Sequence, residues 1–98
     1  MVEDSEFSIT LSNAAAQNFR NLPTSFQQQI LDALNKYLKQ RPYLVTKTRI
    51  KVLQGFQPTM YRLRSGDYRI YYRIYQRSVL VLNIMHKKDS DRWIKSVL

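Results

Sequence analysis

The chain has 98 residues and no cysteine, so it can build one hydrophobic core but neither a second folding unit nor a disulfide or thiolate metal site. Its N-terminus carries acids where a secretory signal peptide would be basic and then apolar, and no apolar run is long enough to span a membrane. The formal net charge is +9, and we expect a single, strongly basic, cytoplasmic domain over residues 1–98.

The first elements predicted along the chain are one strand and two helices. Apolar and polar side chains alternate over residues 6–11, which is typical of a half-buried strand. A short helix follows and ends at Pro23, and Thr24 with Gln27 forms the capping-box pattern of a second helix that runs to Pro42. The apolar stripes of the two helices predict an antiparallel hairpin whose inner side a sheet must cover.

The rest of the chain predicts the sheet and one more helix. We expect residues 43–58 to form a loop that includes a short strand, because glycine and proline interrupt the pattern there. Residues 60–75 alternate on both sides of a turn and predict a β-hairpin, with Gly66 as either the first or the second residue of its two-residue loop. Residues 79–86 are apolar on both faces, which indicates a central strand, and Ser90 can cap a last short helix.

These elements predict an α+β fold. An antiparallel β-sheet carries the N-terminal α-helical hairpin packed on one face, and a short C-terminal helix ends the chain. Alternation along the predicted β-hairpin sorts its side chains to two faces. One face is apolar and carries Tyr61, Leu63, Tyr68, Ile70, Tyr72 and Ile74. The other face is basic, is expected to be exposed, and carries Met60, Arg62, Arg64, Arg69, Tyr71, Arg73 and Tyr75.

Positive charge is concentrated in the second half of the chain. Residues 1–46 carry four basic and four acidic side chains, whereas residues 47–98 carry twelve and three. This asymmetry indicates a polyanionic partner, nucleic acid first and an acidic protein second, with a basic surface kept only for solubility as the alternative. Because guanidinium groups bind phosphates and tyrosine rings stack on unpaired bases, the basic hairpin face suits single-stranded RNA or DNA. The alternative is a solvated face whose arginines only prevent aggregation.

The residue inventory restricts the chemistry that such a face can support. One histidine and no cysteine exclude a paired-histidine nuclease and a cysteine nucleophile. His86 with Asp89 and Asp91 lacks a recognised metal-ligand spacing, so we predict no metal site and no cofactor. One metal-free route remains, in which the RNA 2′-hydroxyl attacks the adjacent phosphodiester and leaves a cyclic phosphate. Arginines can stabilise the developing charge, and His86 or a lysine can protonate the departing 5′-oxygen, although a lone histidine can also be purely structural.

Several segments resemble the RelE/ParE toxin superfamily in their order and spacing. The resemblance rests on YRLRSGDYRIYY at residues 61–72, on the apolar strand that follows and on the short basic run after His86, and it covers nearly the whole chain. It implies a toxin of a type II toxin–antitoxin system. For the ribonuclease branch it implies a metal-independent endoribonuclease that cleaves messenger RNA, typically at the ribosomal A site, and thereby inhibits translation.

The same resemblance implies roles for individual residues. Arg62 falls where these toxins carry a catalytic lysine or arginine, and Arg69 matches the arginine that follows a tyrosine in their motif. Lys87 and Trp93 depart from an arginine and a terminal tyrosine that members carry near those positions. We therefore predict that the catalytic residues are Arg62, Arg69, His86 and Lys87. We predict RNA contacts by Lys51, Arg64, Tyr71, Arg73, Lys88 and Trp93.

Two other functions stay open at this point. The superfamily includes gyrase-poisoning toxins on the same scaffold, so inhibition of DNA gyrase is the first alternative. A catalytically weak module that binds RNA or the antitoxin is the second, and the tryptophan at position 93 favours it. We expect a cognate acidic antitoxin as the protein partner, with messenger RNA and the ribosome as further partners, and neither a membrane nor a small-molecule cofactor. The expected apolar anchors for the antitoxin are Tyr37, Tyr43 and Phe56.

Overall fold

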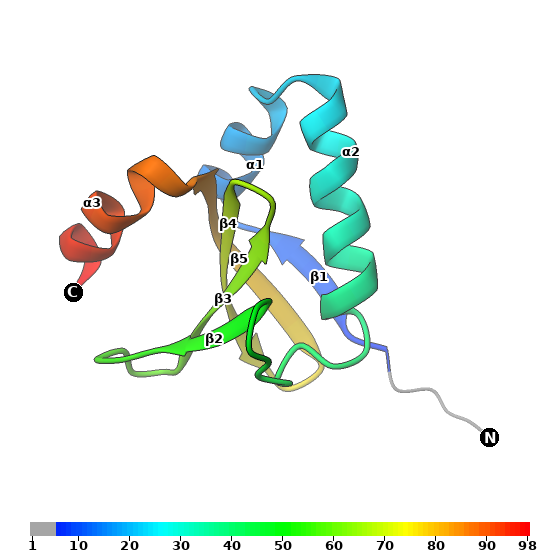
Figure 1. Ribbon diagram of the computed structural model, residues 1–98. Helices are drawn as coiled ribbons and strands as arrows, with labels where there is room; N and C mark the ends of the chain where they lie inside the picture. The colour runs from blue at the N-terminus through cyan, green and yellow to red at the C-terminus, as the bar shows by residue number, and fades with distance from the viewer. Residues whose placement is uncertain (1–5) are drawn as a thin grey trace.

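In the computed structural model, which describes residues 6–98, five strands form one sheet and the helices pack around it (Figure 1). The elements in chain order are β1 (Ser8–Leu11), α1 (Asn13–Arg20), α2 (Thr24–Ala33), the π-helical segment η1 (Leu34–Leu38), β2 (Ile50–Leu53), β3 (Met60–Ser65), β4 (Tyr68–Tyr75), β5 (Ser78–His86) and α3 (Lys87–Val97). Among the described residues, no helix is both long and apolar enough to cross a membrane.

The strands are ordered β1-β5-β4-β3-β2, and β5 therefore lies in the interior of the sheet, as its two apolar faces predict. Neighbouring strands are antiparallel except for β1 and β5, which run parallel. The sheet is thus mostly antiparallel, and the exception is the strand closest to the N-terminus. Ser65 pairs with Tyr68, so Gly66 is the first residue of the hairpin loop, and its φ of 58° is the positive value that such a turn requires.

Both N-terminal helices cover the same face of the sheet. α1 packs on β5 and β1, and α2 packs on β3, whereas the two helices make fewer contacts with each other. The predicted helical layer is confirmed, but the close pairing of the two helices as a hairpin is not. Their side chains close the main core together with the apolar hairpin face, and the buried members of this core include Ala15, Ile30, Leu34, Leu38, Leu63, Ile70, Tyr72, Val79, Val81 and Ile84.

The start of α2 differs from the sequence prediction. Its N-cap residue is Pro23, and no side chain caps the helix, so the capping box is wrong. The Gln27 amide instead donates to the backbone carbonyls of Phe19 and Arg20 at 3.0 and 3.3 Å, which ties α2 to the end of α1. The α-helix ends at Ala33, and the chain continues directly as the π-helical segment η1.

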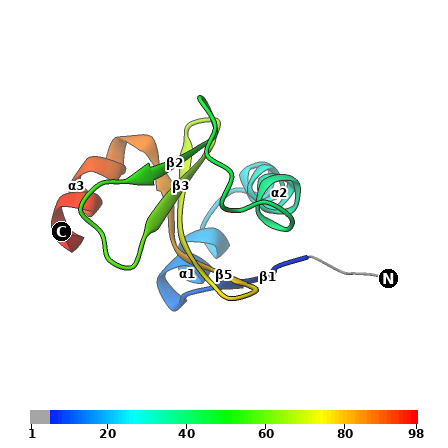
Figure 2. The ribbon, with the colours of Figure 1, turned by 90° about the horizontal axis from the view of Figure 1, so that it is seen from below.

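The basic face of the sheet carries a second, smaller apolar cluster, which the sequence did not predict. Phe56, Met60 and Tyr71 are buried in it, and Leu53, Leu82, Met85, Trp93 and Ile94 pack against them. α3 lies over this cluster, and Figure 2 shows α3 and α2 on opposite sides of β2 and β3. The expectation that this face is exposed is therefore wrong at its centre. Phe56 is also wrong as an exposed anchor, whereas Tyr43 has 54% of its surface exposed.

Candidate nucleic-acid interface

Three arginines meet near the turn of the β3–β4 hairpin. Arg62 and Arg64 lie on β3 and Arg69 lies on β4, and strand alternation puts all three on the basic face. The register pairs Arg64 directly with Arg69, and it pairs Lys51 of β2 with Arg62. Like charges in opposed positions destabilise a sheet. We call Arg62, Arg64 and Arg69 the arginine cluster. The backbone pairing of β3 with β4 keeps its three positive charges close to one another.

Arg69 has the most perturbed charge of the cluster. Partial burial lowers the pKa of its guanidinium, the nearby charges of Arg62 and Arg64 lower that pKa further, and Tyr71 and Asp67 oppose them only in part. Its Nη1 atom donates to the backbone carbonyls of Gly66 and Tyr68 at 3.0 Å each, which holds the side chain against the turn. Arg69 is therefore a fixed cation whose charge is only partly neutralised by the neighbouring protein groups.

Arg62 and Arg73 contribute half-buried side chains whose Nε atoms are buried with no hydrogen-bond acceptor in the described part of the chain. Such unsatisfied donors are unfavourable in a folded protein. The two ion pairs between described residues join Lys87 to Asp67 and Arg92 to Asp89, so neither Arg62 nor Arg73 has a carboxylate partner among them. Both side chains are thus fixed by packing and retain guanidinium groups that an external anion can bind.

Lys87 lies beside the hairpin turn, at the same end of the sheet as the arginine cluster. Its backbone N–H donates to the carbonyl of Asp67 at 2.7 Å, and its Nζ lies 3.5 Å from Asp67 Oδ1. The side chains of both residues are more than half exposed, so this ion pair contributes little to stability and a ligand can displace it. Of the predicted catalytic residues, the structure therefore brings Arg62, Arg69 and Lys87 to one end of the sheet.

His86 faces the other way. It pairs with Tyr68 across β4 and β5, and its ring meets the Tyr68 ring edge-on with centroids 5.5 Å apart, on the helical side of the sheet. Its Nδ1 accepts a hydrogen bond from the Lys88 N–H at 3.1 Å and caps α3. The structure thus separates His86 from the arginine face, and its visible interaction is that of a helix cap.

Tyr71 cannot act as an exposed platform for a base. Only 2% of its surface is exposed, and its ring packs on Trp93 with centroids 4.8 Å apart. The prediction that Tyr71 stacks on RNA is therefore wrong, because α3 docks over the middle of the basic face. Trp93 itself is half-buried, with one side against Tyr71 and the remainder beside a surface hollow that Met85 also lines.

The remaining predicted RNA contacts lie around the arginine cluster rather than within it. Lys51 is exposed on β2 opposite Arg62, and Lys88 is exposed in the first turn of α3. Arg73 pairs with Leu80 farther along β4. The predicted cations therefore spread along the basic face from the hairpin turn toward the far end of β4.

One cation of this interface was not predicted. Arg49 precedes β2, and its Nη1 donates to the backbone carbonyl of Arg64 at 3.3 Å. It lines a surface hollow with Arg64, Gly66 and Asp67, beside the hairpin turn. The sequence predicts a loop around Arg49, and a loop has no alternation that would indicate on which side of the sheet the Arg49 side chain lies. No cluster of three histidine or acidic side chains suited to a metal ion occurs among residues 6–98.

Comparisons with known proteins agree with this architecture. A family model described as the ParE toxin of type II toxin-antitoxin systems, parDE, matches residues 9–90. A search of curated protein sequences gives no match.

Solved structures share the fold at low sequence identity. The archaeal RelE–RelB complex from Pyrococcus horikoshii has 20% identity and a TM-score of 0.69 over 84% of this chain and 96% of that one. The RelBE2 toxin–antitoxin complex from Mycobacterium tuberculosis has 20% identity and a TM-score of 0.70 over 83% of this chain and 98% of that one. A mutant of the Escherichia coli toxin RelE in the free state has 18% identity and a TM-score of 0.59 over 95% and 99% of the two chains.

Proposed function

The chain belongs to the RelE/ParE superfamily of type II toxin–antitoxin toxins, and we propose that it is a metal-independent endoribonuclease that cleaves messenger RNA at the ribosomal A site and so inhibits translation. The observation that carries this proposal is the direct pairing of Arg64 with Arg69 beside Arg62. A sheet gains nothing from like charges in opposed positions, whereas a phosphodiester bound between them would relieve their repulsion.

The proposed reaction needs only the RNA, water and these side chains. The 2′-oxygen forms a bond to phosphorus, the bond from phosphorus to the 5′-oxygen breaks, and a cyclic phosphate remains. Arg62 and Arg69 stabilise the negative charge that develops on the phosphate oxygens. The 2′-hydroxyl loses its proton to water, and the 5′-oxygen receives a proton from Lys87, which lies at the same end of the sheet. Arg64, Lys51, Arg73, Lys88 and Trp93 hold the flanking nucleotides in this proposal.

His86 has a different role in this scheme from the one the sequence suggested. Its Nδ1 is engaged at the start of α3, one residue before Lys87. We therefore assign His86 the positioning of Lys87 through the helix cap rather than proton transfer.

A second candidate function is inhibition of DNA gyrase. The matching family model describes ParE toxins, and the burial of Tyr71 removes one of the expected contacts for an unpaired base. The arginine cluster would then bind an acidic surface or duplex DNA instead of a scissile RNA phosphate.

We also propose that an acidic antitoxin neutralises the chain. The RelE structures from Pyrococcus horikoshii and Mycobacterium tuberculosis are complexes with their antitoxins, and the net charge of +9 favours a partner of opposite sign. A disordered acidic segment can cover a large basic area because it folds as it binds.

Induction of the chain without an antitoxin tests the proposed function. Pulse labelling should show that protein synthesis stops while DNA synthesis continues, and primer extension on messenger RNA from the same cells should map discrete cuts. Intact messenger RNA with an early stop in DNA synthesis would instead support gyrase inhibition. Intact messenger RNA with both syntheses continuing would support a non-catalytic binding module.

A further inference from the structure

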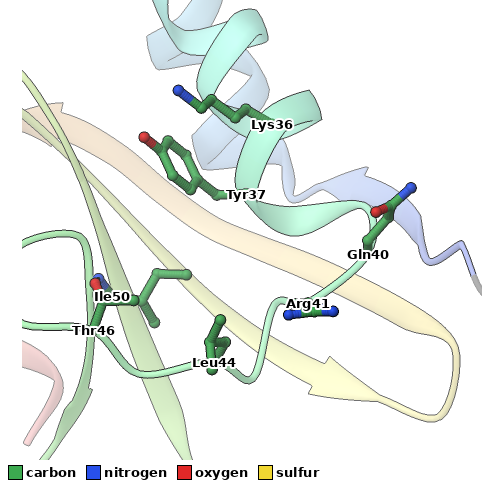
Figure 3. A pocket seen from close by; sticks show the side chains of 7 residues that line it. All are labelled: Lys36, Tyr37, Gln40, Arg41, Leu44, Thr46 and Ile50. Atoms are coloured by element: carbon green, nitrogen blue, oxygen red, sulfur yellow. The ribbon is translucent and has the colours of Figure 1, made fainter.

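A cavity of about 140 Å³ lies outside the arginine cluster, between the end of the second helix and the loop that leads to β2 (Figure 3). Its lining residues are Lys36, Tyr37, Gln40, Arg41, Leu44, Thr46 and Ile50. In Figure 3, Lys36 and Tyr37 extend from the helix to the same side. The cavity therefore has walls from two segments that the proposed catalytic chemistry does not use.

The charge around this cavity is positive and uncompensated. The Lys36 Nζ lies 5.4 Å from the centre of the Tyr37 ring, and the Arg49 Cζ lies 5.6 Å from the same centre. Arg41 is the second cation that lines the cavity, and no acidic residue lines it. Neither ion pair between described residues includes any of these three cations. The electrostatics therefore select an anionic ligand.

The cavity also offers apolar surface for a ring. Ile50 is buried at its floor, and Leu44 keeps 46% of its surface exposed beside the half-buried Tyr37 ring. The Thr46 hydroxyl already accepts hydrogen bonds from the N–H groups of Arg49 and Ile50, so it shapes the loop rather than the ligand. A phosphate with an attached base satisfies both the cationic rim and the apolar floor, as in sites for single-stranded nucleic acid.

Arg49 links this cavity to the arginine cluster. The same guanidinium that lies over Tyr37 donates to the Arg64 carbonyl at 3.3 Å. It also lines the hollow beside Gly66 and Asp67 at the hairpin turn. Arg49 thus places a positive charge between the arginine cluster and the cavity.

The helix geometry at the cavity is unusual. η1 is a π-helical turn, a rare feature that occurs frequently at functional sites, and it contributes Lys36 and Tyr37. The turn keeps Leu34 and Leu38 in the core while it presents Lys36 to solvent and leaves Tyr37 half-buried.

We propose that this cavity is a second nucleotide-binding site, which holds a phosphate and base of the same single strand that the arginine cluster binds. The inference rests on the proposed function, because the strand must first be a substrate or ligand of the cluster. An acidic peptide would also meet the cationic rim, but the charge of Arg49 between the cavity and the cluster favours one polyanionic strand that spans both sites.

Binding of uncleavable RNA tests this site. The probes are 2′-O-methyl oligonucleotides, which lack the attacking hydroxyl, as a trinucleotide and as an oligomer of about twelve nucleotides. The site variant is Lys36→Gln with Arg41→Gln. Its matched control is Arg20→Gln with Lys95→Gln, which removes the same charge from exposed positions outside the cavity lining. Circular dichroism establishes that each variant is folded.

We expect the site variant to bind the long oligomer about tenfold more weakly than the control variant. The slope of log affinity against log salt should also fall by about 0.7, the value for one single-strand phosphate that is no longer neutralised. Trinucleotide binding should be unchanged in the site variant and lost in Arg62→Ala with Arg69→Ala. Equal affinities of site variant and control for the long oligomer would overturn the second site while the proposed function stands.

Two further outcomes are informative. If the cluster variant binds the trinucleotide as well as the wild type does, the proposed function fails, and the second site fails with it. If the site variant binds the long oligomer normally but loses affinity for a polyglutamate peptide, the cavity is a protein-docking site and the nucleotide assignment is wrong.

Discussion

Arg64 and Arg69 occupy directly paired positions on β3 and β4, at the end of the hairpin whose loop begins at Gly66. Their repulsion is a local cost to the fold that ligand binding can offset. We therefore predict that Arg64→Gln raises the free energy of unfolding by about 0.5 kcal/mol while it weakens RNA binding. Urea denaturation at low salt measures the first effect. Arg20→Gln, which removes a charge from an exposed position in the last turn of α1, is the control and should not raise stability, because a cation is favourable there.

Removal of a proposed catalytic cation should greatly slow cleavage without unfolding the protein. We predict that Arg62→Ala and Arg69→Ala each reduce the cleavage rate by about a hundredfold or more, because each removes a cation aimed at the developing phosphate charge. The measurement is single-turnover cleavage of a defined RNA, with Arg20→Ala as the charge-matched control. Arg77 is unsuitable as a control because its guanidinium lies 4.7 Å from the centre of the Phe7 ring and stabilises the core. Normal cleavage by both variants would place the chemistry elsewhere.

The cap role of His86 leads to a separate prediction. Asparagine is a good helix N-cap but cannot transfer a proton, so His86→Asn should retain most cleavage activity and most thermal stability. His86→Ala loses the cap and should lower the free energy of unfolding by about 1 kcal/mol. The measurements are single-turnover cleavage and thermal unfolding of both variants. A His86→Asn variant that is stable yet inactive would indicate that His86 transfers the proton.

Tyr72 predicts a dependence of stability on alkaline pH. Burial, and then its stacked neighbour Tyr61, raise the pKa of the Tyr72 phenol, whose hydroxyl donates to the Pro42 carbonyl at 2.6 Å. A raised folded-state pKa means that this stabilisation is complete below about pH 10, where the unfolded phenol ionises, and is lost as pH rises above it. Tyr72→Phe should cost about 1 kcal/mol at neutral pH. Urea denaturation at neutral pH and at about pH 11 should show this difference shrinking, and a constant difference would contradict the prediction.

Association with the antitoxin should be fast and dependent on salt. The basic half of the chain steers an acidic partner toward itself, so the association rate constant should fall steeply between low and high ionic strength. Apolar anchors such as Tyr43 should affect mainly the dissociation rate. Stopped-flow measurements on the purified pair across a salt series test both parts. An association rate that does not change with salt would mean that the antitoxin first meets another surface.

The sequence predicted the features that depend on local periodicity, but it did not predict how α3 packs on the sheet. The two faces of the hairpin follow from side-chain alternation, the central place of β5 follows from its two apolar faces, and the structure agrees. The position of α3 follows from no local pattern, so the burial of Tyr71 was missed. Met60 and Tyr71, two apolar side chains among arginines, were the available signal that something covers this face.

The candidate site was predicted as a set of residues but not as a geometry. Arg62, Arg64 and Arg69 were grouped correctly on one face, because positions two apart on a strand share a face and the hairpin register fixes the rest. Lys87 and His86 are adjacent in sequence, yet they turn to different sides where β5 ends and α3 begins. That divergence depends on the strand-to-helix junction, which residue types alone do not specify.

The parallel pairing of β1 with β5 has a consequence for synthesis of the protein. Ser8 pairs with Ser78 and Leu11 with Val81, so the first strand finds its partner only after most of the chain has left the ribosome. A contact that closes so long a loop forms late and slowly compared with the β3–β4 hairpin. A nascent chain would thus display a basic hairpin before its core is closed. The order of pairing therefore leaves an interval, between formation of the hairpin and pairing of β1, in which the basic hairpin is accessible while the fold is still incomplete.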